Sequence, residues 1–289
     1  MFLLARLARL LLASGVLAGA AALAAPALQD VTIPMPSGEG LRGLWLPAPG
    51  SGARPAVLAL HGCGGLYGAR GSLSAHYRDA AERLHAEGRG VLLLDSFSSR
   101  GLREICRTPY RERTVTVAVR ARDARAALGW MAAQPGVDRQ RIGVLGWSNG
   151  ATTALNLLEQ RAGHRAASEP AIAGVALFYP GCGPLQRRRA ALERVPLLMQ
   201  LGALDDWTPP APCVELAHRL QGLPDSDVTL HVYEGSYHGF DGTAPVRVRT
   251  DVPNGGTGAG VHVGGNPEAR AQALAALSAF WRRAFGVAY

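Results

Sequence analysis

The sequence predicts an α/β protein with a mostly parallel sheet that is covered by helices on both faces. From Ala56 onward, short apolar runs alternate with longer segments of helical periodicity, the pattern of strands joined by crossover helices. Several runs, such as residues 91–94 (Val-Leu-Leu-Leu), are apolar at every position, which is typical of strands buried on both faces. With 289 residues and no internal repeat or linker, the chain suits one large domain.

The expected elements follow in a regular order. The first two apolar runs have no helical segment between them, so we expect an antiparallel hairpin at one edge of the sheet. Later runs are followed by helical segments, and in one of these Ala118, Arg122, Ala126 and Trp130 recur with helical spacing. The expected strands are 30–33, 41–46, 56–60, 90–94, 141–145, 172–178, 196–201 and 229–233. The expected helices are 72–87, 114–133, 149–161, 212–220 and 267–285.

Two long segments interrupt this alternation. Residues 96–113 are polar and rich in arginine. Residues 242–266 are rich in glycine and proline, and the alternation of valine and arginine over 246–249 suggests a short hairpin. Both segments follow expected strands at the edge where open α/β sheets bind ligands, and long loops in compact domains are commonly functional.

The first residues have the pattern of an export signal. Arginines precede an apolar, alanine-rich run over 10–25, and Ala22-Leu23-Ala24 fits the small-x-small rule for cleavage. A membrane anchor is the alternative, but the run is shorter than the roughly 20 residues of a membrane span. We expect residues 1–25 to be a signal peptide and residues 26–289 to form a single domain, periplasmic or secreted, without a stable membrane span after cleavage.

Composition narrows the function. The formal net charge is +8, but every basic residue is an arginine, and the arginines are scattered apart from Arg187-Arg188-Arg189 in an expected surface helix. Nucleic-acid binding favours a clustered basic stripe, so we expect no such partner. The four cysteines have no C-x-x-C spacing and no histidine pair has ligand spacing, so we expect no metal. An even cysteine count in an exported chain permits two disulfides, with three pairings open.

Residues 146–150 carry the most informative functional signal. They read Gly-Trp-Ser-Asn-Gly, a G-x-S-x-G pattern between an apolar run and a helical segment. A serine hydroxyl becomes a useful nucleophile when a sharp strand-to-helix turn exposes it beside a base. The glycines let the backbone pass closely under Ser148, and the helix N-terminus offers N–H groups to an oxyanion. The pattern predicts that Ser148 is a catalytic nucleophile.

Acid and base candidates come later in the chain, in the order that this kind of serine nucleophile requires. Residues 202–206 (Gly-Ala-Leu-Asp-Asp) follow one expected strand, and His238 follows the last one. We expect His238 to accept the serine proton and Asp205 to orient the imidazole ring. Asp206 is the competing acid, and Asp205 is favoured because it comes first after the strand turn. The alternatives are helix N-capping before Pro209 for the acids and a surface-loop histidine for His238.

Two backbone N–H groups are expected to stabilise the oxyanion. Asn149, the residue after the nucleophile, supplies one of them. The other is assigned to Cys63, because the loop 61–66 (His-Gly-Cys-Gly-Gly-Leu) follows the expected strand 56–60 and its glycines allow N–H groups to turn towards the site. His61 is expected to order this loop.

The chain resembles the dienelactone hydrolase family of α/β-hydrolases in segments 60–65, 146–150, 202–205 with Pro209, and 233–240. The resemblance implies an α/β-hydrolase fold with an eight-stranded sheet, and hydrolysis of esters or lactones without a cofactor. The founding enzymes use a cysteine where this chain has Ser148 and a glutamate where it has Gly62. They also bind a substrate carboxylate with arginines, and residues 239–243 contain none. Dienelactone itself is therefore not the expected substrate.

The same resemblance suggests substrate contacts and disulfides. Arg100 resembles one of the family's carboxylate-binding arginines, and Trp147 and Trp207 are further candidates for substrate contact. In the implied fold all four cysteines come to the same edge of the sheet. We expect Cys182–Cys213 to brace the turn that carries the acid and Cys63–Cys106 to pin the loop 96–113 beside the oxyanion segment. Four reduced, buried thiols are the alternative.

These features predict an exported serine hydrolase that cleaves small or medium carboxylic esters, lactones or thioesters through an acyl-enzyme on Ser148. An acyltransferase or a peptidase could use the same three residues. A binding protein that keeps the fold without catalysis is the alternative from another class, and the complete set of serine, acid and histidine argues against it. The sequence shows no excess of apolar amphipathic segments that would require a subunit partner, and it leaves the oligomeric state open.

Overall fold

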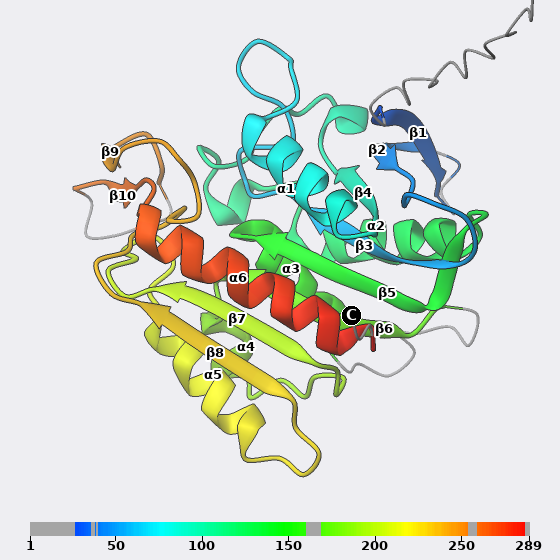
Figure 1. Ribbon diagram of the computed structural model, residues 1–289. Coiled ribbons are helices and arrows are strands. Elements are labelled where there is room, and N and C mark those ends of the chain that lie inside the picture. Colours follow the sequence, from blue (N-terminus) through cyan, green and yellow to red (C-terminus); the bar gives the residue numbers. More distant parts are fainter. Residues whose placement is uncertain (1–26, 36–37, 39, 160–168, 254–258, 287–289) are drawn as a thin grey trace, which may run out of the picture.

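Eight strands form one sheet in the order β1-β2-β4-β3-β5-β6-β7-β8, with helices on both faces (Figure 1). The computed structural model describes residues 27–35, 38, 40–159, 169–253 and 259–286. β1 and β2 form the antiparallel edge hairpin, and neighbouring strands from β4 to β8 are parallel, which confirms the predicted fold class. The strands are β1 (Gln29–Pro34), β2 (Gly40–Leu46), β3 (Arg54–Leu60), β4 (Gly90–Asp95), β5 (Val137–Trp147), β6 (Ile172–Phe178), β7 (Leu197–Gly202) and β8 (Val228–Tyr233).

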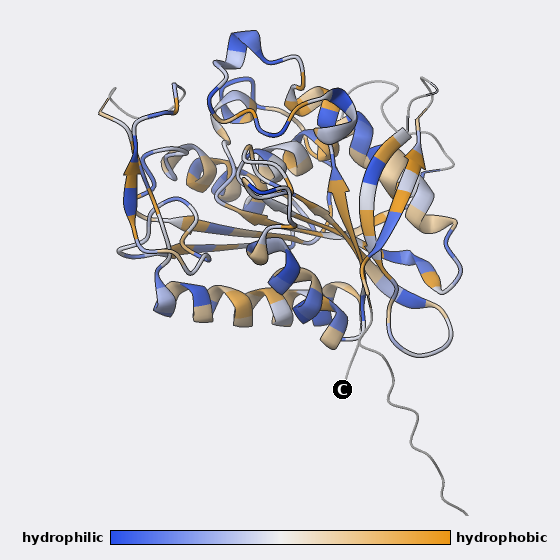
Figure 2. Ribbon diagram, turned by 90° about the horizontal axis from the view of Figure 1, so that it is seen from above, coloured by the Kyte–Doolittle hydropathy of each residue, from blue (hydrophilic) through white to orange (hydrophobic). Residues whose placement is uncertain are grey.

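Each face of the sheet has its own hydrophobic core. Side chains alternate along a strand, so Leu58 of β3 packs on one face and Val57 on the other. The first core is closed by α2 (Val117–Ala132), α3 (Asn149–Leu158) and α5 (Ala211–Gln221). The second core is closed by α1 (Ala75–Ala86) and α6 (Pro267–Ala284). Figure 2 shows the hydrophobic strands between these helical layers.

Some helix bounds differ from those expected. α2 begins at Val117 and not at residue 114, because the Thr116 side chain accepts a hydrogen bond from the Val119 N–H, as an N-cap does. α3 ends at Leu158, earlier than the expected residue 161, and the rest of that expectation lies outside the described residues. The short helix α4 (Gly183–Arg187) holds the first of the three consecutive arginines that were expected in a surface helix.

The two long loops pack together beside the carboxyl ends of the strands. The later loop contains a hairpin of β9 (Arg247–Arg249) and β10 (Val261–Val263), so the expected hairpin is present, with its partner strand further along the chain. A third hydrophobic cluster joins the loops; it contains Cys63, Phe97, Ile105, Cys106, Val115, Val252 and Val261. The hairpin and the arginine-rich loop therefore form one connected layer.

All four cysteines are in disulfide bonds, and both bonds join the cysteines that were expected to pair. They are Cys63–Cys106 and Cys182–Cys213. The expected signal peptide lies outside the described residues. Within the part of the chain that the structure describes, no helix combines the length and apolar character of a membrane span.

Candidate active site

Ser148 lies at a tight turn between β5 and α3. Its backbone adopts φ 52° and ψ −118°, an uncommon conformation for a residue with a side chain. The flanking glycines permit the turn: a Cβ at Gly150 would lie 2.0 Å from the Leu60 carbonyl oxygen, and one at Gly146 would lie 2.7 Å from the backbone of Ala151. No other residue type fits at either position without moving the backbone.

Ser148, His238 and Asp205 form a hydrogen-bonded line. The Ser148 Oγ lies 2.9 Å from His238 Nε2, and His238 Nδ1 lies 2.8 Å from Asp205 Oδ2. His238 and Asp205 are each 4% exposed. Low exposure reduces the competition from water for these hydrogen bonds and strengthens the interaction of the carboxylate with the imidazole ring. The structure therefore brings together all three residues of the expected catalytic set.

The turn after β7 holds Asp205 as an acceptor. Its Oδ1 accepts hydrogen bonds from the backbone N–H groups of Trp207 at 3.0 Å and Thr208 at 2.8 Å, and its Oδ2 accepts one from the Thr208 hydroxyl at 3.0 Å. Asp206 points elsewhere, because its carboxylate accepts from the N–H of His262 at 2.8 Å and lies 2.7 Å from His262 Nδ1. The structure thus separates the two competing acids, with Asp205 on His238 and Asp206 on the β9–β10 hairpin.

Aromatic rings enclose the imidazole ring of His238. The ring centroids of Tyr179 and Trp207 lie 4.6 Å and 4.8 Å from it. The Tyr179 hydroxyl donates a 2.7 Å hydrogen bond to the buried carboxylate of Asp241, which also accepts one from Trp147 Nε1 at 2.8 Å. Burial and the nearby Asp241 charge raise the pKa of Tyr179 well above its ordinary value, so the phenol stays a donor. Sequence reasoning missed Asp241, although it lies three residues after His238.

The loop after β3 lies directly beside Ser148. A Cβ at Gly62 would be 3.5 Å from the Ser148 Cβ, which is van der Waals contact. The Gly62 N–H donates to the Tyr77 hydroxyl at 2.8 Å, and the Cys63 carbonyl accepts from the Ile105 N–H at 2.8 Å. His61 is buried in this loop, and its Nδ1 lies 2.7 Å from the Gly62 carbonyl oxygen. These contacts fit its expected role in ordering the loop.

A cleft of about 480 Å³ opens at Ser148 and His238, which both line it. Trp147 and Trp207 line it, as expected for substrate-contacting residues. Arg100 does not line it: its guanidinium makes two 2.8 Å hydrogen bonds to the buried Asp123. The expectation for Arg100 was therefore wrong, because a buried carboxylate holds its charged group away from the cleft. Arg247 and Arg249 of β9 supply cationic side chains to the cleft wall instead.

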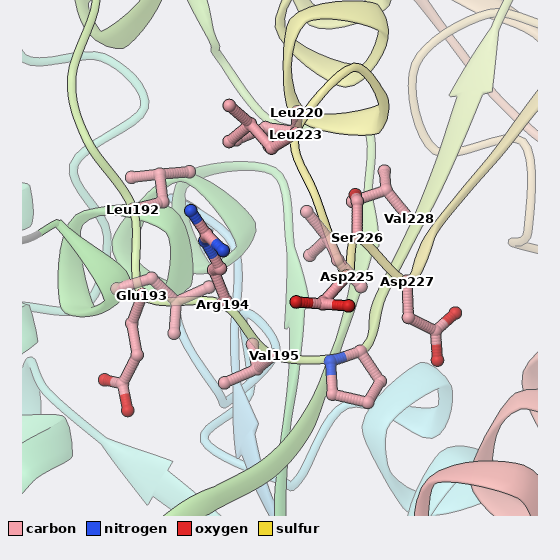
Figure 3. Close-up of a pocket in the computed structure, with 13 residues that line it drawn as sticks. Leu192, Glu193, Arg194, Val195, Leu220, Leu223, Asp225, Ser226, Asp227 and Val228 are labelled. Carbon is pink, nitrogen blue, oxygen red and sulfur yellow. The ribbon is translucent and has the colours of Figure 1, made fainter.

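A second pocket, lined by both apolar and charged side chains, lies at the opposite end of the strands (Figure 3). It has a volume of about 240 Å³ and is lined by residues at the amino ends of β7 and β8, including Val195 and Val228, and by Leu220 of α5. The candidate catalytic residues follow the carboxyl ends of their strands, so this pocket is separate from the active site. Among the described residues, no group of three or more histidine, cysteine, aspartate or glutamate side chains could hold a metal ion.

The chain matches a protein-family model and a protein of Mycobacterium tuberculosis. A model of the dienelactone hydrolase family matches residues 45–285. An uncharacterized protein of Mycobacterium tuberculosis is 32% identical over 197 residues, and the match covers 64% of this chain and 64% of that protein, less than two thirds of its length.

Three solved structures share the fold. A dienelactone hydrolase-like promiscuous phosphotriesterase from metagenomic libraries has a TM-score of 0.61 and 20% identity. The match covers 90% of this chain and 99% of that protein. A thermophilic esterase of Thermogutta terrifontis, with propionate bound, has a TM-score of 0.61 and 19% identity, with 89% and 94% covered. Puromycin hydrolase has a TM-score of 0.63 and 20% identity over 91% of this chain but only 40% of that protein.

Proposed function

The chain belongs to the dienelactone hydrolase family, and from that premise we propose that it hydrolyses carboxylic esters, lactones or thioesters of small molecules through an acyl-enzyme on Ser148. The observation that carries the proposal is the hydrogen-bonded line from Ser148 Oγ through His238 to Asp205, which opens into a cleft. Nucleophile, base and orienting acid within hydrogen-bond distance are the geometric signature of nucleophilic acyl transfer.

The first half of the reaction forms the acyl-enzyme. Ser148 Oγ attacks the substrate carbonyl carbon while its proton passes to His238 Nε2, and Asp205 stabilises the imidazolium that results. The carbonyl oxygen becomes an oxyanion and accepts hydrogen bonds from the N–H groups of Cys63 and Asn149. When the tetrahedral intermediate collapses, the bond to the leaving oxygen or sulfur breaks, and His238 returns the proton to the leaving group.

The second half of the reaction releases the acid. A water molecule loses a proton to His238 Nε2 as its oxygen attacks the acyl carbon, and the same two N–H groups bind the second oxyanion. Collapse breaks the bond to Ser148 Oγ, which recovers its proton from His238. The chemistry needs only protein groups and water.

Cleft size and compartment add to the proposal. A volume of about 480 Å³ lies within the range of small-molecule sites, roughly 300–1,000 Å³. The two disulfides are consistent with a periplasmic or extracellular protein, because disulfides form and persist in oxidising compartments. We propose export by the signal peptide 1–25 and a single catalytic domain over 26–289.

Hydrolysis of p-nitrophenyl esters from acetate to octanoate by the wild type and Ser148→Ala tests this function. We expect release of p-nitrophenol by the wild type, a loss of at least about 10³-fold in the variant, and labelling of the wild type alone by a fluorophosphonate probe. Labelling without hydrolysis, together with product formation only in the presence of an alcohol or amine acceptor, would indicate the acyltransferase. Full activity in Ser148→Ala would refute the mechanism.

A further inference from the structure

Arg120 of α2 is buried against two segments of the candidate site. It is 0% exposed, its Nη1 donates to Asn149 Oδ1 at 2.5 Å, and its Nη2 donates to the His61 carbonyl oxygen at 2.7 Å. The guanidinium carbon lies 5.1 Å from the ring centroid of Phe97. A buried charge is costly unless it is paired and hydrogen-bonded, so a fully buried arginine at this position calls for a functional explanation.

The buried guanidinium of Arg120 stays charged at neutral pH although burial lowers its pKa. Burial lowers the pKa of Arg120 to about 10, while Asp123, one helical turn later, and Asp95 act in the opposite direction. The side chain is therefore still a cation at neutral pH. A cationic guanidinium can donate several hydrogen bonds from one rigid plane, which fixes the angle between its partners as well as their separation.

The two partners of Arg120 belong to the two halves of the oxyanion site. Asn149 is the first residue of α3, so its N–H has no acceptor within the helix and is free for the oxyanion. His61 lies two residues before Cys63, in the loop that Tyr77 and Ile105 hold by further hydrogen bonds. We propose that Arg120 is a positioning residue that sets the separation of the Cys63 and Asn149 N–H groups and thereby tunes oxyanion binding, although it does not touch the substrate. This inference rests on the proposed function.

The same helix offers a matched control. Arg125 also projects from α2 onto α3, but it binds the far end, where its Nη2 donates to the Leu157 carbonyl oxygen at 2.9 Å. It also pairs with Glu169 at 3.0 Å. Replacing Arg125 removes a charged α2–α3 contact as replacing Arg120 does, but leaves the start of α3 and the loop after β3 in place. A general loss of the contact between α2 and α3 would lower catalysis in both variants, whereas a change at the oxyanion site would lower it in Arg120→Met.

The test compares Arg120→Met, Asn149→Ala, their double variant and Arg125→Met in the full chain. The readouts are kcat and KM for p-nitrophenyl acetate and Ki for a trifluoromethyl ketone, which adds to a serine to give an oxyanion. For Arg120→Met we expect kcat to fall by about 10–100-fold, less than the 10²–10³-fold effect of removing an oxyanion donor outright. KM should change less than about 3-fold, and Ki should rise by the factor by which kcat falls. Arg125→Met should keep kcat and Ki within about 3-fold of the wild type.

Asn149→Ala keeps the backbone N–H but removes the side-chain oxygen that accepts from Arg120. It therefore tests the same hydrogen bond if Arg120→Met does not fold. We expect the losses in the double variant to fall well short of the product of the single losses, because both changes break one contact. An unchanged kcat and Ki in Arg120→Met, equal losses in Arg125→Met, or fully multiplicative losses would each overturn the proposal. Activity of the wild type and inactivity of Ser148→Ala would then show that the proposed function stands without it. An inactive wild type that no fluorophosphonate labels would overturn both.

Discussion

The two adjacent acids give a sharp test at the scale of single residues. Asp205→Asn should lower kcat for p-nitrophenyl acetate by about 10³–10⁴-fold, because an amide N–H facing Nδ1 forces the tautomer in which Nε2 already carries a proton. Asp206→Asn removes the same charge one residue later, where the carboxylate holds His262, and we expect a change in kcat below about 3-fold. Steady-state kinetics of both variants decide the assignment. Similar losses in both would contradict it.

The buried His61 predicts a dependence of stability on pH. Burial, and then the nearby Arg120 charge, hold its pKa well below the ordinary value of 6.5. Above pH 6.5 the imidazole is neutral in the folded and unfolded states. Below it, the unfolded state binds a proton that the folded state excludes, so the free energy of unfolding falls by up to about 1.4 kcal/mol for each pH unit until the folded pKa is reached.

Urea unfolding at about pH 7.5, 6 and 5 measures this effect, with His61→Asn as the comparison because an amide can donate to the Gly62 carbonyl as Nδ1 does. Other groups contribute to the slope in both proteins, so the difference between the two slopes is the relevant quantity. We expect the wild type to lose stability more steeply below pH 6.5. Parallel slopes would show that His61 does not hold a depressed pKa.

From the sequence, the position of a candidate residue could be predicted where it follows a strand, but not where it depends on neighbours far along the chain. Ser148, Asp205 and His238 were identified because parallel strands end at one edge of a sheet, so the residues after them meet there. Arg100 was misjudged because its partner Asp123 lies on a helix that the loop pattern does not reveal. Arg247 and Arg249 reach the cleft through pairing of β9 with β10, which a local alternation of valine and arginine cannot specify.

At the scale of elements, the disulfide between Cys63 and Cys106 links the arginine-rich loop to the segment that carries the proposed oxyanion donor. It joins the oxyanion segment after β3 to the arginine-rich loop, and both pack in the hydrophobic cluster with Val261 of β10. Cys182–Cys213 joins the N-cap residue of α4 to α5, the helix that follows the turn carrying Asp205. Removing the first bond should therefore disturb catalysis as well as stability. Removing the second should lower catalysis less, although it was expected to brace the acid turn, because the Asp205 carboxylate is also held by hydrogen bonds from Trp207 and Thr208.

Kinetics and thermal unfolding of the paired variants Cys63→Ser/Cys106→Ser and Cys182→Ser/Cys213→Ser separate these effects. We expect each pair to lose about 2–4 kcal/mol of unfolding free energy. The kcat for p-nitrophenyl acetate should fall by about 10-fold or more in the first pair, since a displacement of about 1 Å at the reacting centre can cost 10²-fold. An unchanged kcat in the first pair would mean that the bond between Cys63 and Cys106 does not position the oxyanion loop.

Element positions were more predictable than the faces that elements bury. The row Ala118, Arg122, Ala126 and Trp130 has helical spacing, but none of these residues is buried. The buried face of α2 contains Arg120, Ala124, Ala127, Leu128 and Met131. Arg120 has helical spacing to the apolar residues Ala124, Ala127 and Met131, and this pattern could have predicted that it is buried. The many other arginines of the chain made the pattern hard to recognise.

At the scale of the whole molecule, two hydrophobic cores and two disulfides stabilise the fold. The sheet buries one large hydrophobic cluster on each face, whereas the layer that borders the cleft is held by the small third cluster, one disulfide and polar contacts such as Arg107–Asp251 and Asp206–His262. The sheet is therefore expected to be the more stable part, and the cleft wall the part that responds first to reduction.

Reduction of the native protein tests this division. The bonds enclose sequence separations of 43 and 31 residues, for which the chain-entropy model gives about 4 kcal/mol each, a large share of the roughly 5–15 kcal/mol typical of a folded domain. We expect no reactive thiol in the unreduced, denatured chain and four after reduction. Reduction should also lower the unfolding temperature by at least about 10 °C, because 1 kcal/mol shifts it by about 2–4 °C at this size. Esterase activity should be lost at a lower temperature than the circular dichroism signal of the sheet, and coincident loss of both would argue against an independently labile cleft wall.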